Sequence, residues 1–158
     1  ILEGSNVYLG TGGTAINVLD LETGERRPST NDDTRVIARL VDALMNQQIV
    51  AGIGKIYSDE ACFRAGVRPG RKASSLTGPM RERLWQAIRE VLSVGIRSRG
   101  SSAKDESYRD IYGIPGRFQD RMMVYQRTGQ PCRVCGAAIR RASIASGRGM
   151  HWCPKCQR

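Results

Sequence analysis

The 158-residue sequence has no apolar run of the roughly 18 to 20 residues that a membrane-spanning helix needs. Its N-terminus also lacks the basic segment and the apolar core of a secretory signal peptide. These two absences predict a soluble cytoplasmic protein without a membrane partner. The chain is long enough for one hydrophobic core, or for two small subdomains that share one.

The sequence lacks an even set of cysteines, which a disulfide framework normally requires. Four of the five cysteines form two pairs, each with two residues between its members. This pattern favours metal ligation in a reducing compartment, and two disulfides are the alternative. Cys62 is left over and is expected to be a small buried side chain.

Acidic residues are scarce in the second part of the chain. Residues 97–158 contain 4 Asp and Glu against 13 Lys and Arg, whereas residues 1–96 contain 11 against 12. Of the 25 basic residues 21 are arginines, whose planar guanidinium suits bidentate contacts with phosphate. The C-terminal part is therefore predicted to bind nucleic acid, and a solvated basic face is the alternative.

The strongest motif is Cys132-Arg-Val-Cys135, followed after seventeen residues by Cys153-Pro-Lys-Cys156. This spacing is typical of a zinc ribbon, in which two tight turns present four thiolates to one tetrahedral ion. We expect one structural Zn²⁺, held by Cys132, Cys135, Cys153 and Cys156. The single histidine, His151, is not needed as a ligand and is expected to lie on the surface or in a groove.

Two helices follow from periodic apolar residues. The first begins after the Asn-Asp-Asp stretch at 31–33 and has one apolar face, formed by Val36, Ile37, Leu40, Val41, Leu44 and Met45. The other begins at a cap on Thr77, with Pro79 in its first turn, and ends near 97–100.

Between these two helices lies a shorter one, predicted over 58–65 and ended by Gly66. It follows a turn that contains Gly52 and Gly54, with Lys55 beside them. The free N–H groups at a helix N-terminus form a natural phosphate seat. Taken alone, a Gly-x-Gly turn before a helix is also compatible with simple packing.

The fold class is therefore mainly α with a small β zinc-ribbon hairpin. Residues 1–30 are predicted as a short β-prone or disordered arm, with β-prone pieces at 6–9 and 15–21. Residues 31–120 are predicted as a helical domain with a long loop at about 100–120. Residues 121–158 form the zinc-finger hairpin, with short strands expected at 122–125, 138–141 and 150–152.

Four segments resemble the formamidopyrimidine-DNA glycosylase and endonuclease VIII family of base-excision repair enzymes. They are QIVAGIGKIYSDEACFRAGVRP (48–69), PGRF (115–118), VYQRTGQPCRVCG (124–136) and GRGMHWCPKCQ (147–157). They match in order and spacing, so the resemblance covers residues 31–158. It implies a helix-two-turn-helix subdomain followed by a zinc finger, which together form the DNA-binding C-terminal half of such enzymes.

The resemblance implies DNA as the partner, as a duplex that can contain a lesion, and nucleoid association in the cytoplasm. The implied phosphate contacts fall on Gly52, Gly54, Lys55, Tyr125 and Arg148. Two positions depart from the family pattern, because Lys55 stands where asparagine is usual and Gln126 where glycine is usual. The loop at 101–116 resembles the segment that closes over a flipped base, and it is about two residues longer.

The family's catalytic groups are an N-terminal proline nucleophile, an adjacent glutamate and a phosphate-binding lysine. The sequence begins Ile1-Leu2-Glu3, with no proline before Pro28 and no lysine before Lys55. No catalytic residue is therefore predicted, and at most a weak abasic-site lyase activity of the Ile1 amine is expected. Both a natural truncation and a fragment of a longer chain fit this start.

Two functions follow from these observations. The first is a zinc-dependent protein that binds duplex or damaged DNA without excising bases. The alternative is a formamidopyrimidine-DNA glycosylase or abasic-site lyase that acts with a missing domain or a partner. A third role, in which the zinc hairpin docks another protein, leaves the C-terminal arginines unexplained.

Overall fold

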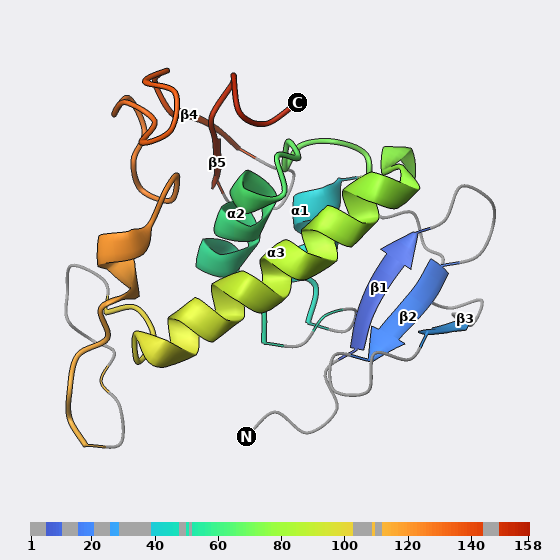
Figure 1. Cartoon of the computed structure of the whole chain (residues 1–158), viewed down its shortest axis with the longest axis horizontal. Coiled ribbons are helices and arrows are strands. Elements are labelled where there is room, and N and C mark those ends of the chain that lie inside the picture. Colours follow the sequence, from blue (N-terminus) through green and yellow to red (C-terminus); the bar gives the residue numbers. More distant parts are fainter. Residues whose placement is uncertain are drawn as a thin grey trace.

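The computed structural model describes residues 6–10, 16–20, 26–28, 39–47, 50, 52–102, 109, 112–143 and 149–158. Three helices form its centre: α1 (Leu40–Met45), α2 (Lys55–Arg64) and α3 (Gly78–Arg97). Helix α3 has 20 residues. Figure 1 shows it crossing the molecule diagonally, with the N-terminal sheet at the right and the zinc hairpin at the upper left, beyond α2. The predicted fold class, mainly helical with a small β hairpin, is confirmed.

Helix α3 packs along α2 through a close approach at Gly95. A Cβ atom at this position would lie 2.7 Å from the Tyr57 hydroxyl oxygen, so any other residue there would have to displace the Tyr57 ring. The Tyr57 ring in turn meets the ring of Phe118 at a centroid distance of 5.0 Å. The main core contains apolar side chains of all three helices, including Leu44, Leu84, Ile88 and Val91. Tertiary packing of these faces supplies most of the stability of such short helices.

The three predicted helices agree with the structure to different degrees. The third predicted helix is confirmed, since α3 follows Thr77 and ends at Arg97, although the Thr77 side chain makes no capping hydrogen bond. The middle helix begins at Lys55, directly after Gly54, and thus three residues before the predicted start. The predicted start of the first helix at 31–33 lies outside the described residues.

An antiparallel sheet with the order β1-β2-β3 precedes the helices: β1 (Asn6–Gly10), β2 (Ile16–Asp20) and β3 (Arg26–Pro28). Strands β1 and β2 coincide with the β-prone pieces predicted at 6–9 and 15–21, and they pair with each other. The third strand was not predicted, and its Pro28 is tolerated because β3 is an edge strand. Strand β1 contacts η2, a 3-10 turn at Ala73–Ser75 between α2 and α3.

The C-terminal part consists of a 3-10 turn, η3 (Phe118–Arg121), and the antiparallel pair β4 (Arg140–Ser143) and β5 (Gly149–Trp152). The two strands confirm the predictions at 138–141 and 150–152 to within two residues. Every residue of β5 is buried, and this strand packs against α2. The strand predicted at 122–125 is wrong, because the N–H groups of Met123, Val124 and Tyr125 bind the carboxylate of Glu60 instead of a neighbouring strand.

The long loop after α3 is closed at its base. The Arg117 N–H donates to the Ser98 carbonyl at 2.8 Å, and the Phe118 N–H donates to the Gly100 carbonyl at 3.0 Å. A Cβ atom at Gly116 would lie 2.4 Å from that same Gly100 oxygen, so glycine is required at this crossing. Among the described helices, none is long and apolar enough to cross a membrane.

Candidate nucleic-acid interface and metal centre

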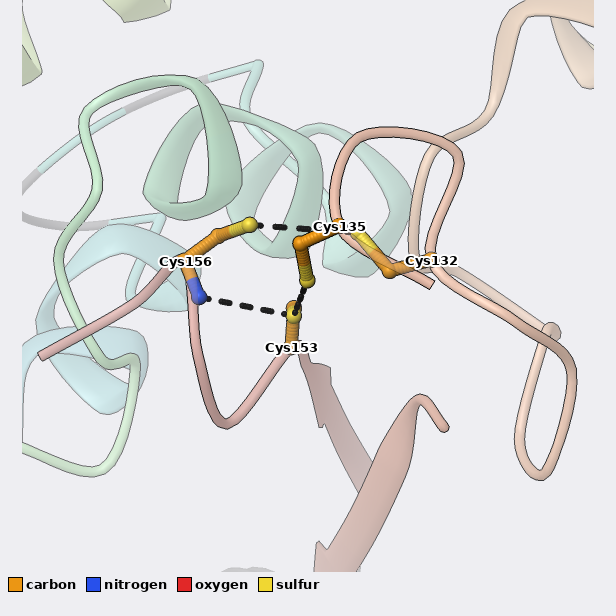
Figure 2. A group of neighbouring side chains, drawn as sticks. All are labelled: Cys132, Cys135, Cys153 and Cys156. Carbon is orange, nitrogen blue, oxygen red and sulfur yellow. Dashed lines mark hydrogen bonds between the residues drawn. The ribbon is translucent and has the colours of Figure 1, made fainter. Parts of the chain in front are cut away.

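The two cysteine pairs converge on one point. The sulfur atoms of Cys132, Cys135, Cys153 and Cys156 all lie within 4.8 Å of one another. Figure 2 shows them on two turns that face each other above the β4–β5 hairpin. The Sγ atoms of Cys132 and Cys156 are 3.9 Å apart, and those of Cys135 and Cys153 are 3.4 Å apart. Four sulfurs bound at about 2.3 Å to one tetrahedral zinc would lie about 3.8 Å apart, so the donor set fits this ion.

Both turns are held by hydrogen bonds that direct the thiolates inward. The N–H groups of Val134 and Cys156 point at the sulfurs of Cys132 and Cys153, at 3.5 and 3.4 Å. The side chain of Gln157 accepts a hydrogen bond from the Cys153 N–H at 2.8 Å and donates one to the Val67 carbonyl at 3.0 Å. Gln157 therefore joins the second turn to the segment that follows α2.

Four thiolates complete a tetrahedral site and leave no position for water or substrate. A zinc ion bound there is structural: it stabilises the hairpin and takes no part in a reaction. The fifth cysteine, Cys62, is fully buried in the helical core, as the sequence predicted. Burial and the nearby Asp59 raise the pKa of its thiol, so Cys62 stays neutral and does not compete for the metal.

The glycine turn before α2 is held by Gln47, a residue that the sequence did not single out. Its side-chain oxygen accepts a hydrogen bond from the Gly52 N–H at 3.0 Å, and its amide donates to the Ile53 carbonyl at 2.8 Å. Gly52 has a φ of 86°, which side-chain-bearing residues rarely adopt. A Cβ atom at Gly54 would meet nothing within 4 Å, so the first turn of α2 faces open space.

A fully buried carboxylate, Asp59, links this helix to the zinc hairpin. Its Oδ2 atom lies 2.8 Å from Lys55 Nζ, and it accepts hydrogen bonds from the His151 backbone N–H at 3.0 Å and from His151 Nδ1 at 2.8 Å. His151 is only 6% exposed, so its predicted surface position is wrong. The histidine is a buried partner of Asp59, and among the described residues only the four cysteines form a metal-binding group.

A second buried carboxylate, Glu60, binds the segment that leads into the zinc hairpin. It accepts hydrogen bonds from the N–H groups of Met123, Val124 and Tyr125, at 2.9 to 3.0 Å. Burial raises the pKa of Glu60, although these three donors and Arg64 lower it in part. Two adjacent residues of α2 thus bind the C-terminal part of the chain: Asp59 binds strand β5, and Glu60 binds the segment before the zinc hairpin.

Tyr125 lies where these contacts meet. Its ring is 5.5 Å from Lys55 Nζ and packs edge-on against His151 at 5.2 Å. Burial, and next the charge of Asp59, raise the pKa of its phenol, which therefore keeps its proton at neutral pH. The structure thus brings together Gly54, Lys55 and Tyr125 of the predicted DNA contacts. Arg148 lies outside the described residues.

A hollow of about 580 Å³ opens beside this group. Its walls come from the start of α2, the base of the long loop and the segment before the zinc hairpin, and they include Ile56, Ser101, Ser102, Pro115 and Tyr125. Gln126, at the position where the resembled family has glycine, also lines it and has a φ of 55°. Gln126 thus adopts a left-handed backbone conformation that glycine would adopt without strain.

Replacing Asp59 by asparagine tests the link between α2 and the zinc hairpin. The donors all bind Oδ2, so the amide can keep one acceptor for them, but it cannot match the charge of Lys55. It also places an NH₂ group at the buried Oδ1 position, where no hydrogen-bond partner lies. We expect Asp59→Asn to lower the free energy of unfolding by about 2–3 kcal/mol, the range for hydrogen bonds to buried charged groups. Urea titration of the zinc-loaded protein measures this change.

The matched control is Asp120→Asn, the same chemical change in an exposed pair. Asp120 lies 3.3 Å from Arg117 Nε and its side chain is 57% exposed. Such pairs contribute about 0–1 kcal/mol, so this variant should unfold nearly like the wild type. Equal effects of the two substitutions would show that Asp59 does not join the two parts.

Comparison with known proteins identifies both parts of the chain. The family model of the formamidopyrimidine-DNA glycosylase H2TH domain matches residues 28–107. The model of the zinc finger found in FPG and IleRS matches residues 129–158, which contain all four clustered cysteines. The cofactor implied by this match and by the sulfur geometry is one structural zinc.

Curated relatives agree with these matches. The formamidopyrimidine-DNA glycosylase of Thermus thermophilus is 49% identical over 114 residues, which are 72% of this chain and 42% of the relative. That of Listeria innocua is 36% identical over 144 residues, which are 91% of this chain and 49% of the relative. The chain thus spans less than half the length of these relatives.

Solved structures show the same arrangement. The MutM (Fpg) protein of Thermus thermophilus superimposes with a TM-score of 0.71 at 48% identity, over 76% of this chain and 45% of that one. Lactococcus lactis Fpg in complex with DNA containing FAPY-dG gives a TM-score of 0.68 at 35% identity, over 78% and 43%. The chain belongs to the formamidopyrimidine-DNA glycosylase family and contains its H2TH domain and its zinc finger.

Proposed function

We propose that this chain binds duplex DNA at the surface where the glycine turn of α2 meets the zinc hairpin. The observation that carries the proposal is the grouping of Gly54, Lys55 and Tyr125 around the open first turn of a helix. The first N–H groups of a helix have no acceptors within it, and its dipole favours an anion there. A DNA phosphate is the ligand that suits this position in a strongly basic chain.

Each residue has a distinct part in this proposal. Gly52 and Gly54 let the backbone approach the phosphate, and Tyr125 donates its phenolic hydrogen. Lys55 is already paired with Asp59, so it adds less than a free ammonium would. Arg148 is proposed as a further phosphate contact from the hairpin. The proposed helical domain, residues 31–120, supplies the glycine turn of this surface. The proposed zinc-finger domain, residues 121–158, supplies Tyr125 and Arg148.

Damaged DNA is the proposed preferred form of the duplex. Lactococcus lactis Fpg has been solved in complexes with DNA containing FAPY-dG and with DNA containing an abasic site. In this chain the hollow of about 580 Å³ beside Tyr125 offers space for an unpaired nucleotide. A protein that binds DNA in this way would associate with the nucleoid.

We favour binding without base excision, because the residues that the described part of the chain brings together, Gly54, Lys55 and Tyr125, suit phosphate binding. The second candidate is a glycosylase or abasic-site lyase that acts together with further residues or a partner. It is favoured by the family membership itself. Incubation with duplexes that contain 8-oxoguanine, formamidopyrimidine or an abasic site, with borohydride to trap an imine, separates the two candidates. Efficient trapping and strand scission would contradict binding alone.

The binding surface is tested at Gly54, which has room for a side chain and the extended backbone of a helix N-cap. Aspartate and asparagine are both good N-caps, so neither should destabilise α2. Only Gly54→Asp places a negative charge at the proposed phosphate. We expect it to weaken binding about tenfold or more relative to Gly54→Asn, a difference of about 1.4 kcal/mol. Equal affinities, measured by fluorescence anisotropy, would remove the turn from the DNA interface.

A further inference from the structure

A second hollow, of about 480 Å³, lies at the C-terminal end of α3 and the base of the long loop. Its walls carry four arginines, namely Arg97, Arg99, Arg117 and Arg121. Among the described residues that line it, Asp120 is the only acidic one, so these described residues carry a formal charge of +3. We call this site the arginine hollow.

Two of the four arginines, Arg97 and Arg121, have no compensating partner among the described residues. Asp120 lies 3.3 Å from Arg117 Nε, and both side chains are more than half exposed. Within the described part of the chain, the side chains of Arg97 and Arg121 make no ion pair or hydrogen bond. Arg97 complements the dipole at the end of α3, but this does not explain three further cations around one hollow.

Arg99 stands in a backbone conformation that disfavours it. Its φ is 58°, in the left-handed region where a Cβ atom crowds the following carbonyl and where glycine is the usual residue. Gly100, the next residue, has a φ of 78°. A strained residue that persists at such a position points to a function of its side chain.

The arginine hollow adjoins the hollow beside Tyr125. Pro115, Arg117 and Asp120 line both of them, so the two are separated only by the base of the long loop. A strand held at the first hollow would come within reach of the arginines when it passes this base. The position thus favours a ligand that already lies on the proposed DNA surface.

We propose that the arginine hollow is an additional phosphate-binding site, which takes the phosphodiester backbone of the same bound DNA beyond the glycine turn. The inference rests on the proposed DNA binding and extends its footprint to the end of α3. Guanidinium groups match phosphate oxygens in planar, bidentate pairs, and the sugar next to the phosphate can rest on Ile114 and Pro115.

The test compares the zinc-loaded full chain with the double variant Arg97→Gln and Arg121→Gln. Affinity for a lesion-containing duplex is measured by fluorescence anisotropy over a series of KCl concentrations. Because each lost phosphate contact lowers the slope of log K against log salt by about 0.9, the slope should fall in magnitude by about 1.8. The control variant Lys72→Gln and Arg89→Gln removes the same charge from exposed positions away from both hollows and should keep the wild-type slope.

Arg99→Gly separates function from folding. Glycine relieves the left-handed backbone, so the thermal midpoint should not fall, while the affinity for DNA should. A lower midpoint with unchanged affinity would assign Arg99 a structural role and overturn its part in the site.

The outcomes also separate this inference from the proposed function. If the wild type shows no salt-dependent DNA binding, the proposed function itself fails. If the wild type binds and the double variant binds with the same slope, only the arginine hollow is overturned. If inorganic phosphate at constant ionic strength releases DNA from the wild type but not from the double variant, free phosphate competes with the DNA backbone for the arginine hollow, and the proposal is supported.

Discussion

Removal of zinc is expected to unfold the C-terminal hairpin and to leave most of the helical structure in place. The apolar cluster of the hairpin is small, shares Phe63 with α2 and includes the ligands Cys132 and Cys153. Structural zinc contributes apparent free energies of about 10–16 kcal/mol to domains of this kind, far more than such a cluster can supply. The main helical core, by contrast, contains no residue of β4 or β5.

The helical part and the zinc hairpin each contain one tryptophan, so fluorescence can follow the two parts separately. Trp152 is buried in β5, where it packs with Val41 and Met45 of α1, and Trp85 belongs to α3. In a Trp85→Phe variant, a chelator should shift the fluorescence of Trp152 to the red, while circular dichroism at 222 nm falls only in part. Complete loss of the helical signal would show that the helices depend on the hairpin. Cys62→Ser serves as control and should still bind one zinc per chain.

Substitution of Glu60 by glutamine is expected to lower the free energy of unfolding at least as much as Asp59→Asn does. In the wild type, three consecutive backbone N–H groups donate hydrogen bonds to the Glu60 carboxylate, which is fully buried. The amide keeps one acceptor oxygen but loses the charge, and its NH₂ group takes the place of Oε2, which now accepts from the Met123 N–H. A loss of about 3 kcal/mol follows from charged and buried hydrogen bonds of this kind, or roughly 6–12 °C in the melting temperature of a protein of this size.

Differential scanning calorimetry of the zinc-loaded protein measures this loss. Glu90→Gln is the matched control, since Glu90 pairs with Arg64 on the outside of α3 and its side chain is 58% exposed. It should change the melting temperature by only a degree or two, as exposed pairs contribute little. Similar melting temperatures of the two variants would show that Glu60 does not anchor the segment before the hairpin.

The features that depend on local sequence were predictable. The spacing of the four cysteines defines the metal site, because each pair lies within a single tight turn. Helix α3 follows from its regular apolar period between Thr77 and Arg97. The turn at Gly52 and Gly54 was visible for the same reason, since glycine marks backbone that other residues avoid.

The features that depend on distant partners were not predictable. Asp59 and Glu60 look like ordinary helix-surface acids in the sequence, and only the fold brings them to residues more than 60 positions away. His151 was expected at the surface or in a groove because the four cysteines already complete the metal site. Its burial follows from its bond to Asp59, which lies 92 positions away in the sequence. Likewise, Gln47 and Gln157 act through hydrogen bonds that no pattern in the sequence announces.

The central claim is that the glycine turn and the zinc hairpin form one DNA-binding surface. Amide chemical-shift mapping of the zinc-loaded chain during titration with a lesion-containing duplex tests it most directly. We predict that the amides of Gly52, Gly54 and Tyr125 shift together with one apparent affinity, while the amide of Lys72, directly before η2, stays unchanged. Shifts confined to one side of this surface, or their absence at both Gly54 and Tyr125, would contradict it.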